Sequence, residues 1–230
     1  MTYNIFNEVS GEYDKWFELY PGRMIYEIEL NLLKQYSNGF NSLEIGVGTG
    51  RFSKYLNIDI GLDPSIGMLQ IAVSYNRVGN AILAFGENLP FRDSSLERVY
   101  LITTISFLND LNRVLNEVYR ILKHNGRLII AFIPRDSPWG RHYTRLGLEG
   151  HKIYSKARFQ SYPILVELLE RHRFKITSIK STLFQKPNER INKRDIIVDN
   201  YDNRASFIVI ESIKINPKTI EINGSISKAF

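Results

Sequence analysis

The sequence predicts an α/β fold: a mostly parallel β-sheet with helices on both faces and an antiparallel strand near the C-terminus. From residue 41 onward, short apolar runs alternate with helical segments, which is the pattern of βαβ units. A glycine-rich turn follows the first of these runs, and two long β-like runs come late in the chain. A chain of 230 residues suits one core with added elements.

The elements are expected in the following order. Helical periodicity predicts two N-terminal helices, over 3–20 and 24–36, separated by Pro21 and Gly22. Strands are predicted at about 41–46, 57–62, 80–85, 98–104 and 126–133, with helices at about 50–56, 65–76 and 109–123. A loop over 134–155, a helix around 164–169, strands over 174–186 and 205–215, and an intervening loop over 187–204 complete the chain. Residues 216–230 are predicted to be a peripheral extension.

The amino-acid composition excludes several kinds of active site and limits the expected location and partners of the protein. The chain has no cysteine, which excludes disulfides, thiolate metal sites and a cysteine nucleophile, and we expect no metal site. No signal peptide or membrane span is recognisable, so we expect a cytoplasmic protein that binds no membrane. The net charge of +6 permits an anionic substrate, but the basic residues are scattered, so a nucleic-acid partner is not favoured.

The glycine-rich turn over residues 43–50 (LEIGVGTG) indicates a cofactor site. Glycines allow positive φ and close approach of a ligand to the backbone. A dinucleotide-binding loop would have a third glycine where this chain has Arg51. Glu44, two residues before the first glycine, suits an ammonium group better than a pyrophosphate. Asp63, at the tip of the second strand, can accept both ribose hydroxyls, and it can also cap the next helix.

Three motifs in this order, LEIGVGTG at 43–50, GLDPS at 61–65 and GENLPF at 86–91, resemble those of class I S-adenosylmethionine-dependent methyltransferases, which have a Rossmann-like fold. The closest resemblance is to the small-molecule branch that includes the ubiquinone and menaquinone biosynthesis methyltransferases, and it covers roughly residues 6–186. It implies that Glu44 and the glycine loop hold the methionine part, that Asp63 holds the ribose, and that Pro64 or Met68 packs on the adenine. Many relatives have an acidic residue where this chain has Phe85, so backbone groups of residues 86–89 are expected to contact the adenine instead.

The resemblance also implies a helical lid over the cofactor, formed by residues 1–40, on a methyltransferase domain of residues 41–215. Aromatic faces attract cations, which suits Tyr13 and Trp16 to a sulfonium ligand. The complete expected cofactor set is Tyr13, Trp16, Glu44, Gly46, Val47, Gly48, Gly50, Asp63, Pro64, Ser65, Met68, Gly86, Glu87, Asn88, Leu89, Thr103 and Thr104.

The acceptor side is expected beyond the carboxyl ends of the strands, where ligands bind in parallel sheets. Residues 103–107 follow the fourth strand there, and a second aromatic and basic cluster follows the fifth. The expected substrate residues are Tyr20, Phe107, Trp139 and Arg141. Candidate catalytic residues are His142, His151 and Tyr143, and either histidine could act as a general base near neutral pH, although a lone histidine is more often a structural or exposed residue. No catalytic residue is assigned.

The predicted reaction is direct in-line transfer of a methyl group from S-adenosylmethionine to an unidentified small molecule, with S-adenosylhomocysteine as product, by a monomer or homodimer. Three alternatives remain. An NAD-type oxidoreductase shares the ribose-binding acid, although the glycine spacing disfavours it. An RNA or protein methyltransferase would suit the basic charge, and a non-catalytic S-adenosylmethionine-binding protein would need only the cofactor site.

Overall fold

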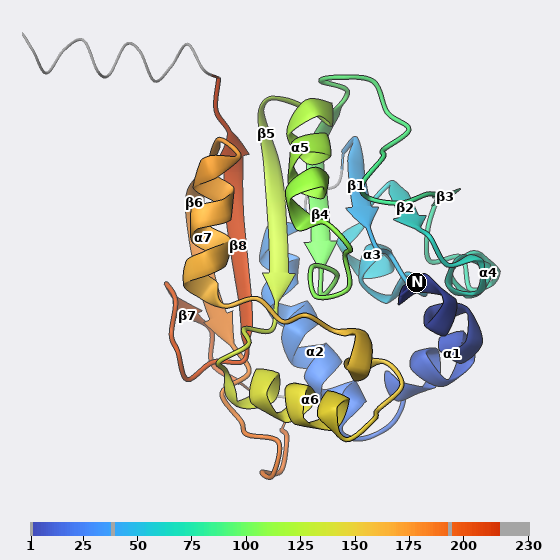
Figure 1. Cartoon of the computed structure of the whole chain (residues 1–230), viewed down its shortest axis with the longest axis vertical. Helices are drawn as coiled ribbons and strands as arrows, with labels where there is room; N and C mark the ends of the chain where they lie inside the picture. The colour runs from blue at the N-terminus through green and yellow to red at the C-terminus, as the bar shows by residue number, and fades with distance from the viewer. Residues whose placement is uncertain (1, 38–39, 193–194, 217–230) are drawn as a thin grey trace, which may run out of the picture.

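The computed structural model describes residues 2–37, 40–192 and 195–216 and has the predicted fold class. Its eight-stranded sheet has the order β3-β2-β1-β4-β5-β8-β6-β7. The pairs from β3 to β5 are parallel, whereas β8 runs antiparallel between β5 and β6. The predicted parallel sheet with an antiparallel C-terminal strand is therefore confirmed (Figure 1).

The bounds of the elements are as follows. The strands are β1 Ser42–Ile45, β2 Ile60–Asp63, β3 Asn80–Leu83, β4 Leu96–Ile102, β5 Leu122–Phe132, β6 Phe174–Thr182, β7 Val198–Asp199 and β8 Phe207–Lys214. The α-helices are α1 Thr2–Trp16, α2 Gly22–Leu33, α3 Arg51–Leu56, α4 Ile66–Ser74, α5 Leu111–Ile121, α6 Pro138–Leu148 and α7 Tyr162–Arg171, and the 3-10 turns are η1 Lys34–Tyr36 and η2 Tyr154–Lys156.

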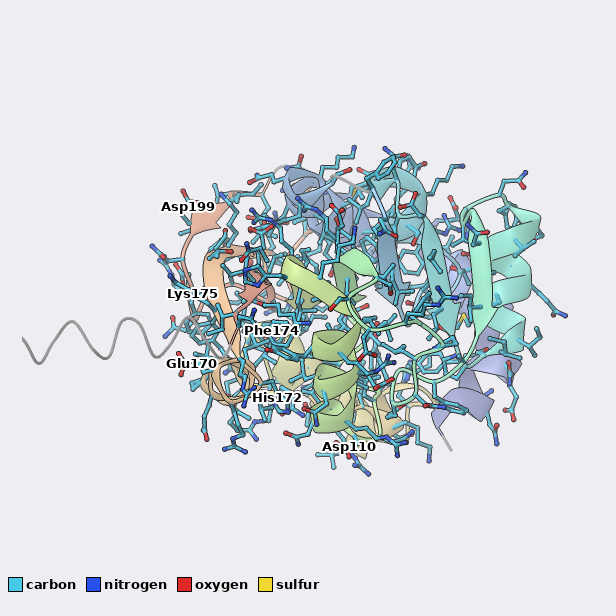
Figure 2. The ribbon with its side chains drawn as sticks, turned by 90° about the horizontal axis from the view of Figure 1, so that it is seen from above. Asp110, Glu170, His172, Phe174, Lys175 and Asp199 are labelled. Carbon is cyan, nitrogen blue, oxygen red and sulfur yellow. The ribbon has the colours of Figure 1, made fainter. Side chains whose placement is uncertain are left out.

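Both faces of the sheet are buried, as the alternation of strand side chains requires. In β4, Val99 and Leu101 pack in one core cluster with α5 and α7, whereas Tyr100 and Ile102 pack in a second cluster with α2 and α6. Residues 128–132 of β5 alternate between the same two clusters. Seen from above, Phe174 at the start of β6 lies beside α7, and Asp199 of β7 marks the outer margin of the sheet (Figure 2). The central strands β4 and β5 are apolar along most of their length because both of their faces are buried.

The loop predicted over 134–155 is wrong, because it contains α6. Ser137 caps this helix by accepting a hydrogen bond from the Gly140 N–H, and Pro138 occupies the first turn. A Cβ at Gly140 would lie 2.0 Å from the Pro134 carbonyl oxygen, so the helix can pack there only with glycine. Glycine lowers helix propensity, which hides this helix from sequence periodicity.

Other boundaries moved by a few residues. The predicted 109–123 helix ends at Ile121, because Leu122 already pairs with Leu96 as the start of β5. Within the predicted loop over 187–204, Val198 and Asp199 form β7 against β6. The expected extension falls outside the described residues from position 217 onward. Within the described part of the chain, no helix has the length and apolar character needed to cross a membrane.

The strand order fixes where a ligand site can form. β1 lies between β2 and β4, so the chain moves outward through β2 and β3 and then returns across β1 to β4. Connections leave β1 and β4 in opposite directions, which opens a crevice at their carboxyl ends. Helices α1, α2 and α6 lie at that end of the sheet (Figure 1).

Candidate active site

The loop after β1 is shaped by three glycines with positive φ: Gly46 at +73°, Gly48 at +53° and Gly50 at +74°. A Cβ at Gly46 would lie 2.3 Å from Cγ2 of Thr104, so only glycine fits beside the end of β4. A Cβ at Gly48 would lie 3.8 Å from the Tyr13 ring, at ordinary van der Waals distance. Glycine therefore keeps the loop backbone free of a side chain where it faces α1.

Asp63 at the end of β2 is 8% exposed and organises this loop. One carboxylate oxygen accepts a hydrogen bond from the Gly48 N–H at 2.9 Å, and the other accepts one from the Ser65 N–H at 2.8 Å. Burial raises the pKa of Asp63 to about 6, although both hydrogen bonds oppose this rise. The alternative that Asp63 caps the next helix is wrong, because Ser65 caps α4 through the Met68 N–H.

Glu44 in β1 is 1% exposed and belongs to the same site. The Ser53 hydroxyl of α3 donates a hydrogen bond to it. Burial raises the pKa of Glu44 to about 8, which shows how costly its ionised form is without a cation. A positively charged ligand group beside Glu44 would therefore gain a strong partner.

Glu44 and Asp63 line a cavity of about 950 Å³, mouth included, at the carboxyl ends of β1, β2 and β4. Most of the predicted cofactor residues line it together: Tyr13, Glu44, Gly46, Val47, Gly48, Asp63, Pro64, Met68, Gly86, Glu87, Thr103 and Thr104. We call it the loop cavity. Among its lining residues, sequence reasoning did not assign Phe6, Phe17, Thr49, Arg51, Phe52, Phe85, Ile102, Leu108 and Asn109 to the cofactor site.

Helix α1 is held over the loop cavity by a buried ion cluster. Asp14 pairs with Arg51 at 2.7 Å and with Arg77 at 2.6 Å, and Arg77 also donates to the Thr49 carbonyl at 3.0 Å. Hydrogen bonds from the two guanidinium groups outweigh burial and hold the pKa of Asp14 well below its usual range. Arg51, at the position of a missing third glycine, thus serves to attach α1 to the glycine loop.

Thr103 marks the end of β4 with a backbone φ of +53°. A β-branched residue in this region is strained, and such strain persists where the surrounding structure imposes it. Here the Thr103 N–H donates to the Ala131 carbonyl at 2.8 Å, and Thr104 lies against Gly46. The chain turns sharply at this point, and Thr103 lines both the loop cavity and a second one beside it.

The second cavity, which we call the aromatic cavity, shares Tyr13, Phe17, Phe52, Thr103 and Phe107 with the first. Its other walls come from α2, α6 and the segment around η2. The predicted residues Trp139, His142, Tyr143 and His151 line it, and so does Trp16, which was expected to contact the cofactor. The structure thus brings together two cavities with a shared wall.

Some predicted site residues lie elsewhere. Gly50 and Ser65 begin α3 and α4 next to the loop cavity but are not part of its lining. The N–H of Leu89 donates to Glu117, and Asn88 lies outside the lining as well. Tyr20 is exposed and accepts a hydrogen bond from the Ile191 N–H, and Arg141 is exposed on the outer side of α6. Tyr20 and Arg141 line neither cavity.

Tyr154 and Glu29 are among the residues of the aromatic cavity that the sequence prediction did not name. Tyr154 comes from η2, a turn without regular periodicity. Glu29 comes from α2, four residues after Ile25 and next to Ile28, on the buried stripe of that helix. A carboxylate on an apolar stripe is unusual, and that signal in the sequence would have singled out Glu29.

Together these features define a nucleotide-type cofactor site on an α/β sheet: a glycine loop after β1, a buried acid within β1 and an acid at the tip of β2. The family model of a methyltransferase domain matches residues 43–130, which include all three elements. The class of protein is thus set by the same segment that forms the loop cavity.

Two relatives match almost the whole chain, and a third matches part of it. An uncharacterised protein of Methanocaldococcus jannaschii is 35% identical over 212 residues, covering 92% of this chain and all of that protein. The solved structure of an S-adenosylmethionine-dependent methyltransferase of Thermotoga maritima is 35% identical, covers 94% of this chain and all of that one, and superposes with a TM-score of 0.85. The demethylmenaquinone methyltransferase of the same organism is 36% identical over 94 residues, 38% of this chain and 41% of that protein. The chain belongs to the class I S-adenosylmethionine-dependent methyltransferases, and it is an enzyme of that family.

The residues present fit S-adenosylmethionine. The loop cavity lined by Gly48 has room for the ligand, the buried Glu44 can pair with a cation such as its ammonium group, and Asp63 has carboxylate lone pairs for ribose hydroxyls. Phe85, at the position where many relatives have an acid, lines the same cavity and offers a ring rather than a carboxylate.

Proposed function

We propose that this enzyme transfers the methyl group of S-adenosylmethionine to a small molecule bound in the aromatic cavity. The observation that carries the proposal is the shared wall of the two cavities at Tyr13, Thr103 and Phe107. A sulfonium in the loop cavity would present its methyl group toward that wall. The aromatic cavity is enclosed by helices on several sides, which suits a small organic acceptor better than a polymer.

S-adenosylmethionine supplies an activated methyl group whose carbon–sulfur bond breaks with the electron pair left on sulfur. The acceptor atom provides the lone pair for the new bond and afterwards loses a proton to solvent or to a nearby base. The protein's contribution is alignment and exclusion of water, which can lower the barrier by roughly 7 kcal/mol or more. We assign α1, attached through Asp14, the role of the lid that provides this exclusion.

A base is available if the acceptor needs one. Burial and the neighbouring Arg145 lower the pKa of His142, which leaves its imidazole neutral and able to accept a proton at neutral pH. Burial raises the pKa of Tyr143 well above its usual value, so its phenol stays protonated and cannot be that base. The Thermotoga maritima relative is named a possible histamine N-methyltransferase, and histamine is an amine.

The test is binding followed by turnover. Calorimetry with S-adenosylhomocysteine is expected to show one site, and Asp63→Ala is expected to lose affinity by roughly 100-fold or more, because two charge-assisted hydrogen bonds to the ribose disappear. Asp93→Ala, an exposed carboxylate paired with Arg120, is the matched control and should bind as wild type does. A metabolite screen that follows S-adenosylhomocysteine formation then identifies the acceptor. Unchanged affinity in Asp63→Ala, or methylation only of bulk RNA or protein, contradicts the proposal.

A further inference from the structure

A buried carboxylate in the aromatic cavity has no hydrogen-bond or ion-pair partner among the residues that the structure describes. Glu29 of α2 is 4% exposed and lines the cavity. Among residues 2–37, 40–192 and 195–216, no side chain or backbone N–H hydrogen-bonds to it, and no ion pair includes it. Buried carboxylates are ordinarily paired or hydrogen-bonded, so an unpaired one that lines a cavity indicates a missing ligand group.

Aromatic side chains line the cavity together with this carboxylate. Tyr143 of α6 and Tyr154 of η2 stack with ring centroids 4.3 Å apart, and Trp139 lies 5.4 Å from Tyr143. Tyr13 and Trp16 of α1 line the same cavity. Aromatic side chains beside a carboxyl group that ionises when it is paired can bind an organic cation, since cation–π contacts and an ion pair then act on the same group.

The electrostatics agree with the geometry. Burial alone raises the pKa of Glu29 to about 8, so no cationic side chain offsets its burial. Burial raises the pKa of Tyr13 the most. Negative charge on Tyr154 and Glu29, and then on Asp63 and Glu44, raises this pKa further. Tyr13, which lines both cavities, is therefore influenced by the acids of both.

The other titratable groups that line the aromatic cavity come from each element around it. They are Glu12 and Tyr13 of α1, His142 and Tyr143 of α6, and His151, Lys152 and Tyr154 at η2. Glu12, His151 and Lys152 are exposed, and Lys152 does not lower the pKa of Glu29. Glu29 is thus the buried acid of this cavity.

We propose that the acceptor is an organic amine that enters as a cation, with its nitrogen between the Glu29 carboxylate and the rings of Tyr143 and Tyr154; this nitrogen loses one proton to solvent or to a nearby base before it attacks the methyl group, because an ammonium has no lone pair for the new bond. This inference rests on the proposed methyl transfer, because it assigns the acceptor class of the same site. Glu29 is a specificity-determining residue: it selects amines over neutral molecules of the same shape. The rings supply the fit to the apolar part of the molecule.

The experiment is a titration of the full chain, with and without saturating S-adenosylhomocysteine, with 2-phenylethylamine and histamine as probes. The neutral isostere 2-phenylethanol measures the contribution of the charge. We expect at least one amine to bind at least tenfold more tightly than the alcohol. Pairing ionises Glu29, so amine binding near pH 7 should release a proton, which titrations in phosphate and Tris buffers detect as a difference in apparent enthalpy.

Glu29→Gln keeps the shape and removes the charge. It is expected to lose the preference for amine over alcohol and the proton release while binding S-adenosylhomocysteine as wild type does. Glu27→Gln, on the same helix and paired with Arg23, is the matched control. If Glu29→Gln does not fold, the wild-type preference and proton release decide the question.

The outcomes are separable. Equal binding of amine and alcohol by wild type, no binding of either amine, or an intact preference in Glu29→Gln overturns the amine inference and leaves the methyltransferase proposal standing. A wild-type protein that binds an amine but not S-adenosylhomocysteine contradicts the proposed function instead and supports Glu29 as an amine-binding residue.

Discussion

Glu44→Gln tests whether the ionised Glu44 carboxylate destabilises the ligand-free fold and whether a bound cofactor offsets this loss of stability. Glu44 is almost completely buried, and burial raises its pKa to about 8, far above the ordinary value of 4.5. A group whose pKa is higher in the folded state binds more protons there, so the stability of the ligand-free fold falls as pH rises from about 4.5 to about 8. Glutamine has the same shape and carries no such cost.

The magnitude follows from linkage. Each pH unit in that window costs up to about 1.4 kcal/mol of unfolding free energy. By pH 7 the cost approaches about 3 kcal/mol, and the Ser53 hydroxyl can still donate to the glutamine carbonyl oxygen. Glu44→Gln should therefore be as stable as wild type near pH 4.5 and increasingly more stable toward pH 8. Asp63 titrates in both proteins, so the difference between them reports Glu44.

Glu44→Gln should weaken cofactor binding, although it stabilises the ligand-free fold. The ammonium group of S-adenosylhomocysteine would lose an ionised partner, which is worth about 1.5–3 kcal/mol and corresponds to roughly a 10- to 100-fold weaker affinity. Wild-type affinity should rise between pH 6 and pH 8 as Glu44 ionises more easily, and this rise should be much smaller in the variant.

Urea unfolding at several pH values and calorimetry with S-adenosylhomocysteine measure the two effects. Glu97→Gln, an exposed carboxylate paired with Lys123, serves as the control and should change neither. The reasoning is refuted if the stability difference between Glu44→Gln and wild type does not grow with pH, or if the variant binds the ligand as tightly as wild type.

Two further substitutions test the framework of the site. Asp14→Asn leaves Arg51 and Arg77 without their shared carboxylate, so it should destabilise the fold by about 3 kcal/mol and weaken S-adenosylhomocysteine binding, whereas Arg171→Ala, in an exposed pair with Glu167, should cost at most about 0.5 kcal/mol in urea unfolding. A wild-type affinity in Asp14→Asn would show that α1 is not needed over the cavity. Gly46→Ala places a Cβ 2.3 Å from Thr104 at a φ of +73° and should abolish ligand binding. Its control is Gly11→Ala, which has open space around it in α1 and should leave the free energy of unfolding unchanged or raise it by about 0.5–1 kcal/mol. Equal ligand binding by both variants would contradict the close approach of the glycine loop to Thr104.

Local features of the sequence determined the sheet and the cofactor loop. Apolar runs bounded by turn residues specify strands because burial on both faces demands them, and glycines at 46, 48 and 50 specify a turn that other residues adopt only under strain. An acid at the tip of β2 follows from the same local order. These features lie within one stretch of chain, and for that reason the fold class and the family could be predicted from it.

Tertiary structure alone decided the acceptor side. The aromatic cavity gathers Tyr13, Glu29, Trp139, Tyr143 and Tyr154 from segments that are remote in sequence and have no common pattern. The role of Arg51 was likewise invisible, because its partner Asp14 lies in α1, before the sheet begins. Helix α6 escaped prediction because its glycines serve close contacts, Gly140 with the Pro134 carbonyl and Gly147 with the Tyr154 carbonyl, at a cost in helix propensity. Contacts of this kind depend on how the elements pack, and the sequence records them only as single residues out of pattern, as at Glu29.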